Sequence, residues 1–182
     1  LPDRVKKQSK SVFLKLAEAE ARIHGTTVDA VHFHEVGAVD SIVDIVGCCL
    51  AKEWLEIDHV LVGPLPAGHG TIQCAHGVYP SPAPAVVELL KGHPLVQIDE
   101  PFELVTPTGA ALLTGWKTLA TLPAGSRIVR AGYSFGHHTL NTRPNVLRAI
   151  LLETDAPPQN TSDTCLVLES NIDDTNPELL GS

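Results

Sequence analysis

Apolar residues recur along the chain with two periods, one helical and one extended. Residues 3–23 carry an apolar stripe every three or four positions among lysines and glutamates, which predicts an amphipathic packing helix. Gly25 follows directly, as expected just beyond a helix end. Residues 38–56 and 82–92 also show helical spacing, and a further helix is expected to begin at Thr106.

Short runs rich in Val, Ile and Leu, bounded by glycine and proline, predict the strands. The expected strands are 31–34, 59–63, 95–98, 103–105, 127–133, 146–152 and 166–168. Residues 68–84, rich in glycine and proline, are expected to form a loop-rich hairpin. Strands that alternate with helices, some joined by short turns, indicate an α/β or α+β fold with a mixed sheet flanked by helices.

Residues 155–163 form the clearest linker in the chain, since they are mostly polar and contain two prolines. We therefore predict a main α/β domain over 1–154 and the start of a following domain over 164–182. The sequence contains no methionine, so we expect it to be a fragment of a larger chain.

The segment 31–50 concentrates ionisable groups in an apolar run. His32 and His34 alternate along a predicted strand and would share one face, where two imidazoles suit a divalent metal or one anionic ligand. Asp40 and Asp44 follow at helical i, i+4 spacing. Because this helix is apolar nearly all round, we expect it to be buried, and Asp44 then needs a metal, a cation or backbone donors.

Ordinary structural roles stay open for this segment. The two histidines can bond to backbone groups, Glu35 can lie in solvent, and Asp40 can simply complement the dipole of the helix that begins beside it. The clustering of groups whose pKa values are easily perturbed nevertheless favours a functional site.

Composition narrows the classes of function. With 13 basic and 21 acidic residues the net charge is −8, which argues against nucleic acid as the main partner. No apolar run reaches the length of a membrane span and no signal peptide is visible, so we expect a cytoplasmic protein that contacts no membrane. Aromatic residues make up only 4% of the chain, so the core should be aliphatic.

Four cysteines occur without a CxxC pair, and we read them as small buried residues in a reducing compartment. They are Cys48, Cys49, Cys74 and Cys165.

A second group of candidates suits an anion. Thr106, Thr108 and Gly109 stand where a strand is expected to run into a helix, and free N–H groups at a helix start attract phosphate. Simple capping is the alternative, and the residues alone favour it. Arg143, two residues before Asn145, can clamp a phosphate or carboxylate, with a surface ion pair as the alternative.

The histidines outside the central segment are weaker candidates. His69 and His76 lie at the two ends of the expected hairpin and can meet across it, or both can be exposed loop residues. His137 and His138 are adjacent on an extended chain, so at most one of them would enter a site. The strand ends at His34, Val105 and Tyr133 are expected to converge on one crevice.

Near the C-terminal end, Asp173 and Asp174 follow a predicted strand and precede a predicted helix start, an arrangement that suits a second divalent metal or helix capping.

Six blocks of the sequence resemble the nickel-insertion protein family known as LarC, in the order in which that family carries them. The blocks are HFHEVGAVDSIVDIVG, AHGVYPSPAPAVVELLKG, ELVTPTGAALL, AGYSFGHH, RPNVLRAILLE and ESNIDDTNPE. The resemblance runs from about residue 28 to the C-terminus, and it leaves the paired histidines of AGYSFGHH without support as ligands.

The resemblance implies a nickel cyclometallase, a lyase dependent on cytidine triphosphate (CTP). It would insert nickel into a pyridinium bis-thiocarboxylate mononucleotide during biosynthesis of the nickel-pincer cofactor of lactate racemase. His32, His34 and Glu35 would hold or pass the nickel, whose ligands include imidazole and carboxylate. Asp40 and Asp44 would ligate it or support its ligands.

The remaining candidates would bind the mononucleotide, with the phosphate near Thr106, Thr108 and Gly109. His76 is favoured over His69 because it falls in the better-matching block, and Arg143 and Asn145 complete the set.

The resemblance places the CTP site, with its manganese or magnesium, in a C-terminal domain that this fragment lacks, along with the family's N-terminal block. An inactive fragment is therefore one expected outcome. We also expect a homo-oligomer, and the apo-enzyme that receives the cofactor as a further partner.

Two other functions fit the residues. The His and Asp cluster can activate water in a metal-dependent hydrolase of a phosphorylated small molecule. It can also form a buried polar network in a non-enzymatic assembly domain.

Overall fold

The computed structural model describes residues 1–31, 33, 39–74, 77–154 and 164–170. The helices in these ranges are α1 (Asp3–His24), the 3-10 helix η1 (Val28–Ala30), α2 (Val39–Trp54), α3 (Pro84–Leu89) and α4 (Pro107–Trp116). The strands are β1 (His59–Val62), β2 (Leu65–Ala67), β3 (Thr71–Cys74), β4 (Gly77–Pro80), β5 (Leu95–Gln97), β6 (Arg127–Phe135), β7 (Val146–Glu153) and β8 (Thr164–Ser170).

The main sheet has the order β1-β8-β7-β6 and is mixed. β1 runs parallel to β8, whereas β7 is antiparallel to both of its neighbours, β8 and β6. β2 and β5 form a parallel pair, and β3 and β4 form an antiparallel hairpin. Four of the sequence-based expectations are confirmed here: the mixed sheet, the hairpin, and strands at 127–133 and 146–152.

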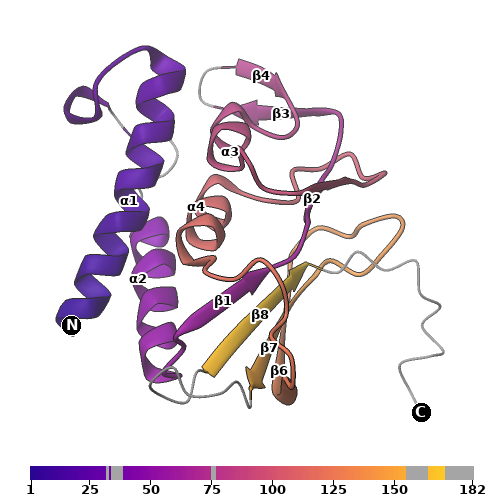
Figure 1. Ribbon diagram of the computed structural model, residues 1–182. Coiled ribbons are helices and arrows are strands. Elements are labelled where there is room, and N and C mark those ends of the chain that lie inside the picture. The colour runs from indigo at the N-terminus through magenta and orange to yellow at the C-terminus, as the bar shows by residue number, and fades with distance from the viewer. Residues whose placement is uncertain (32, 34–38, 75–76, 155–163, 171–182) are drawn as a thin grey trace.

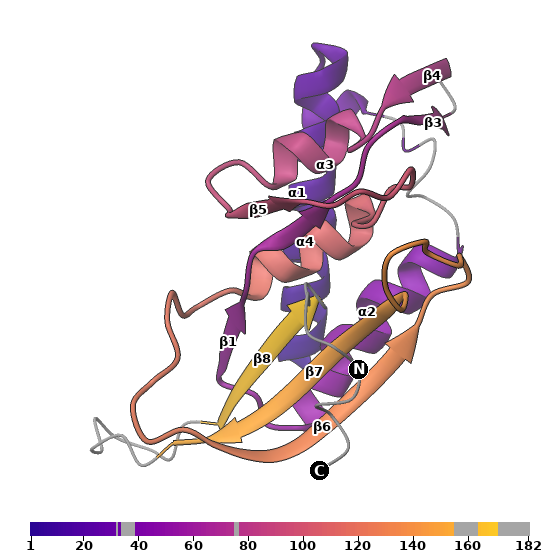
Figure 2. The ribbon, with the colours of Figure 1, turned by 90° about the vertical axis from the view of Figure 1, so that its right-hand side faces the viewer.

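The helices pack against one another beside the sheet. α1 and α2 lie side by side, and α4 packs between α1 and β1 (Figure 1). Seen from the side of the sheet, β6, β7 and β8 lie in front and the helices behind them (Figure 2). The arrangement confirms a mixed α/β fold in which helices cover one face of the sheet.

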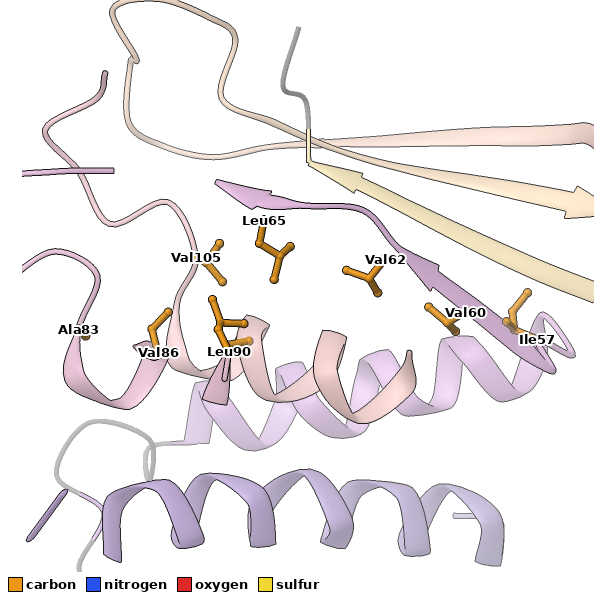
Figure 3. Close-up of a cluster of buried hydrophobic side chains, with 9 residues drawn as sticks. Ile57, Val60, Val62, Leu65, Ala83, Val86, Leu90 and Val105 are labelled. Atoms are coloured by element: carbon orange, nitrogen blue, oxygen red, sulfur yellow. The ribbon is translucent and has the colours of Figure 1, made fainter. Parts of the chain in front are cut away.

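The first of two aliphatic cores lies between β1, α3 and α4. The cluster extends from Val86 of α3, past Val105 and Leu65, to Val62 and Val60 of β1 (Figure 3). Ala149 and Leu151 of β7 pack against this core from the sheet. Removal of these branched side chains from water is the main favourable contribution to folding.

The second core joins α1, α2 and α4. Val5, Val12 and Leu16 of α1, from the stripe predicted by the sequence, are almost fully buried against Ile45 and Cys49 of α2. α1 ends where the sequence predicts, with Gly25 in the left-handed conformation and its N–H bonded to helical carbonyls.

Helix α2 is not buried all round, so the expectation of a fully buried helix is wrong. Its buried stripe is Ser41, Ile45, Cys49 and Lys52, and Val43 on the opposite side is 62% exposed. Lys52 satisfies its charge locally, because its Nζ donates to the carbonyl of Ile57 at 2.8 Å. Burial lowers the pKa of this lysine. Only one stripe of the helix is fully buried, and the apolar side chains of Val39, Ile42 and Val43 are exposed.

Two strand assignments also differ from the sequence-based expectation. Residues 103–105 pair with none of the described strands and lead directly into α4, so the predicted strand there is wrong. Residues 65–67, which follow the predicted strand 59–63 and contain Pro66, form a further strand, β2, beside β5. A proline is tolerated there because β2 is hydrogen bonded on one side only among the described strands.

β8 lies beyond the predicted linker yet belongs to the main sheet, where it separates β1 from β7. The division into a domain over 1–154, a linker over 155–163 and a following domain from 164 stays a prediction. Residues 155–163 and 171–182 lie outside the described residues.

Within the described ranges, no helix combines the length and the apolar character needed to cross a membrane.

The one-sided burial of α2 can be tested by a matched pair of truncations. Ile45→Ala removes a side chain that is 0% exposed and should lower the free energy of unfolding by about 2–5 kcal/mol, because it leaves a cavity in the second core. Val43→Ala, two residues away, should change it by less than about 0.5 kcal/mol. Urea denaturation measures both, and equal losses would contradict the orientation of α2.

Candidate functional site

A pocket of about 300 Å³ opens where the N-terminal end of α4 faces the segment that joins β6 to β7; we call it the α4 pocket. Its polar lining includes Thr106, Gly109, Arg143 and Asn145, which are four of the six residues predicted to bind a cofactor or substrate. Segments almost 40 positions apart in the sequence thus meet at one cavity. Its volume falls at the lower end of the range for small-molecule sites, which begins at about 300 Å³.

The N-terminal end of α4 supplies one wall. Thr106 is the N-cap in extended conformation, and its hydroxyl accepts a hydrogen bond from the Gly109 N–H at 3.3 Å. The cap that the sequence predicted is therefore present. Capping does not exclude an anion site, because the helix dipole still places partial positive charge at this end. Thr108 is half-buried and does not line the pocket.

The opposite wall carries the cationic group. Arg143 is half-buried and lines the pocket, and its Nε donates to the hydroxyl of Thr142 at 3.4 Å. A guanidinium facing a helix N-terminus gives the pocket a positive character that suits a phosphate or carboxylate. No Asp or Glu side chain is among the described residues that line it.

Asn145 is held in place at the end of β6. Its side-chain Nδ2 donates to the carbonyl of His138 at 3.1 Å, and its own carbonyl accepts from the Gly136 N–H at 2.9 Å. The approach is so close that a Cβ on Gly136 would lie 2.7 Å from Cγ of Asn145. A Cβ at 136 is therefore accommodated only if the Asn145 side chain moves.

The apolar part of the lining was not predicted as part of a site. Leu65 and Val105 form the floor and belong also to the first core, which Figure 3 shows from the core side. Leu113 and Phe135 are among the other apolar residues of the lining. The strand ends at Val105 and Tyr133 were expected to converge on a crevice. Val105 lines the pocket although no strand ends there, and β6 continues past Tyr133 to Phe135, which lines it too. His34 lies outside the described residues.

Of the central segment 31–50, the structure describes Val31, Phe33 and the residues from Val39 onward. His32, His34 and Glu35, the predicted nickel ligands, lie outside the described residues. Asp40 lies in the first turn of α2 as predicted, and its Oδ1 accepts a hydrogen bond from the Ser41 N–H at 2.7 Å. Asp44 is exposed, so the expectation that it is buried and needs a partner is wrong.

The other predicted residues are not among the described residues that line the α4 pocket. His69 bonds to Asp99, with 3.0 Å between Nε2 and Oδ1, and His138 stacks on Phe102 with 5.0 Å between ring centroids. His76, Asp173 and Asp174 lie outside the described residues. Among the residues that are described, no three His, Cys, Asp or Glu side chains gather in an arrangement that can hold a metal ion.

The cysteines match their predicted structural role only in part. Cys49 is fully buried, and this burial raises the pKa of its thiol, which makes it unreactive. Cys48 is exposed, contrary to expectation, because it points away from the α1 side of α2. Cys74 is half-buried, and nothing is described of the side chain of Cys165.

Comparison with known proteins decides the family. The profile described as "Nickel insertion protein" matches residues 1–182. The chain belongs to this family. Relatives named "Pyridinium-3,5-bisthiocarboxylic acid mononucleotide nickel insertion protein" are 46% identical to this member in Staphylococcus epidermidis, Geobacillus kaustophilus and Clostridium acetobutylicum.

This family member spans a little under half the length of those relatives. The alignments cover 100% of this chain in each case, but 45%, 46% and 42% of the three relatives respectively. No solved structure matches the chain.

The close contact at Gly136 predicts a specific sensitivity of the pocket. Gly136→Ala should lower the free energy of unfolding by about 1–3 kcal/mol, because the new methyl group forces the Asn145 side chain from its place. Gly132→Ala, in the same strand, meets nothing within 4 Å and should change it by less than about 0.5 kcal/mol. Urea denaturation measures both. An equal response of the two variants would show that Asn145 is not held against Gly136.

Proposed function

We propose that the chain is the substrate-binding part of a protein that inserts nickel into pyridinium-3,5-bisthiocarboxylic acid mononucleotide. The observation that carries the proposal is the α4 pocket, which joins a helix N-terminus and Arg143 to an apolar floor. This combination suits a ligand with one anionic end and one aromatic end. Relatives 46% identical to this chain are named for a ligand of that kind, pyridinium-3,5-bisthiocarboxylic acid mononucleotide.

In this proposal the phosphate of the mononucleotide lies between the start of α4 and Arg143. Pro107 carries no N–H, and the N–H groups of Gly109 and Ala110 already bond to Thr106, which caps the helix start. The attraction for a phosphate therefore comes from the Thr108 N–H, the helix dipole and the guanidinium. Asn145 offers a neutral amide for the ribose.

The pyridinium ring then faces Leu65, Leu113 and Phe135. A cationic ring gains from contact with an aromatic face, and the branched side chains exclude water around it. His76, from a block that resembles the nickel-insertion family, completes our set of substrate-binding residues.

Nickel in this proposal is a substrate and reaches the ring from the central segment. His32, His34 and Glu35 hold or pass the ion, and Asp40 and Asp44, exposed at the start of α2, support them. Imidazole and carboxylate together form a ligand set that nickel accepts.

We assign the CTP dependence, with its manganese or magnesium, to the part of the longer protein outside this chain, and we keep Asp173 and Asp174 as the candidates for a second metal. Hard divalent ions that accompany a triphosphate prefer carboxylate ligands. The described lining of the α4 pocket carries no carboxylate and so does not fit that role. The proposed catalysis is that of a nickel cyclometallase. In this proposal the enzyme is a homo-oligomer and passes its product to an apo-enzyme.

Binding of nicotinic acid mononucleotide, a stable pyridinium mononucleotide, tests the pocket directly. Arg143→Ala should weaken its binding about tenfold or more, because a charged hydrogen bond to the phosphate is lost. Arg130→Ala removes an exposed arginine of β6 that does not line the pocket and should leave the affinity unchanged. Calorimetric titration measures both, and equal affinities of the two variants would place the nucleotide elsewhere.

The nickel step has a separate test. Calorimetric titration with nickel should show tight binding that the double change His32→Ala, His34→Ala removes while the circular dichroism spectrum stays intact. The matched control, His137→Ala with His138→Ala, removes two imidazoles that the resemblance does not support as ligands and should keep the binding. Retained nickel binding in the first variant would exclude His32 and His34 as ligands.

A further inference from the structure

A fully buried carboxylate lies behind the α4 pocket without lining it. The side chain of Glu100 is 0% exposed, although it belongs to the loop between β5 and α4. Its Oε1 accepts from the backbone N–H and the hydroxyl of Thr142 at 2.7 and 2.6 Å. Its Oε2 accepts from the backbone N–H and the side-chain Nδ2 of Asn141 at 2.9 and 3.3 Å.

These donors keep Glu100 ionised. Burial by itself raises the pKa of a carboxyl group, but here the hydrogen bonds from Asn141 and Thr142 and the charge of Arg143 outweigh it, and the pKa lies below its usual value. A buried carboxylate with all its lone pairs occupied holds its donors in one geometry, because any shift leaves an unpaired charge.

The loop that carries Glu100 is itself held firmly. The Glu100 carbonyl accepts from the His69 N–H at 2.9 Å, and its N–H donates to the carbonyl of Ile98 at 2.9 Å. Gly68 lies so close that a Cβ there would come within 2.8 Å of the same Glu100 carbonyl. The carboxylate is therefore a fixed point to which another segment is attached.

The attached segment is the one that builds the cationic wall of the pocket. Arg143 follows Thr142 directly and donates to its hydroxyl, and Asn145 is fastened two residues later to the Gly136 N–H. The wall is thus held at one end by Glu100 and at the other by the end of β6.

We propose that Glu100 is a positioning residue that sets Arg143 and Asn145 for nucleotide binding through its hydrogen bonds to Asn141 and Thr142. The inference rests on the proposed function, since it concerns the same pocket. Glu100 does not touch the ligand. It acts through the backbone of the segment 141–145, and its removal lets the guanidinium sample positions that do not face the phosphate.

Glu100→Gln tests this role with almost no change in shape. Whichever oxygen is replaced, the new amide group faces donors, so at least one buried bond is lost. Affinity for nicotinic acid mononucleotide should fall about tenfold. The matched control is Asp99→Asn, which removes the same charge at the neighbouring residue. The Asp99 side chain is 92% exposed, so this change should leave the affinity unchanged.

A double-mutant cycle separates positioning from general loss of stability. Thr142→Val deletes the hydroxyl that donates to Glu100 and accepts from Arg143, and it is the milder variant if Glu100→Gln fails to fold. The two changes combined should weaken binding less than the product of their separate effects, because both act on one contact. Thermal unfolding of every variant reports whether the fold is retained.

The outcomes distinguish the two proposals. If the unaltered protein binds the nucleotide and Arg143→Ala weakens it, but folded Glu100→Gln and Thr142→Val bind like the unaltered protein, this inference is overturned and the proposed function stands. If the unaltered protein binds no nucleotide, the proposed function fails and the role of Glu100 in binding fails with it. If the loss of affinity in the double variant equals the product of the two separate losses, the positioning role of Glu100 is also overturned.

Discussion

The close approach of α4 to the elements on both its sides is the constraint on which the rest of the structure depends. Ala110 and Ala111 are both 0% exposed, yet they belong to different cores, one with β1 and α3 and the other with α1 and α2. Adjacent alanines let one helix touch two layers without a gap, and larger side chains there would force the layers apart. The same helix is capped by Thr106, so the packing that joins the two cores also fixes the wall of the α4 pocket that Thr106 and Gly109 form.

The period of the apolar residues was sufficient to predict the elements whose buried face is decided by their own sequence. The stripe of Val5, Val12 and Leu16 predicted α1, and it is the face that α1 buries. For α2 the pattern predicted an apolar helix but not which stripe would be covered, because that depends on the position of α1. The buried stripe even contains Lys52, whose charge is satisfied by a carbonyl five residues ahead, a contact that no hydrophobicity pattern contains.

The residues of the site can be divided in the same way, into those that the local sequence predicts and those that only the fold reveals. Thr106, Gly109, Arg143 and Asn145 were found from local chemistry, a capped helix start and a cation near an amide, and the fold brings them to one pocket. Glu100 was not predicted as part of the site because a glutamate in a loop ordinarily lies in solvent. Its burial depends on donors more than 40 positions away at 141 and 142, and one sequence gives no sign of that pairing. The apolar floor was missed for a related reason, since Leu65 and Val105 serve the core and the pocket together.

The chemistry of the α4 pocket bears on the three functions considered for this chain. A hydrolase of phosphorylated molecules needs a metal-bound water and a base beside the phosphate, and both need carboxylates or imidazoles. The described lining offers a guanidinium, an amide, a capped helix start and apolar side chains instead. An assembly domain has no need of a cationic wall fixed at both ends. A protein that holds a mononucleotide still while a metal is delivered from a separate segment needs such a wall, because its binding site must not compete for the metal. For that reason a pocket whose described lining carries no metal ligands supports the proposed insertion function, in which we propose the histidines of the central segment as the nickel ligands.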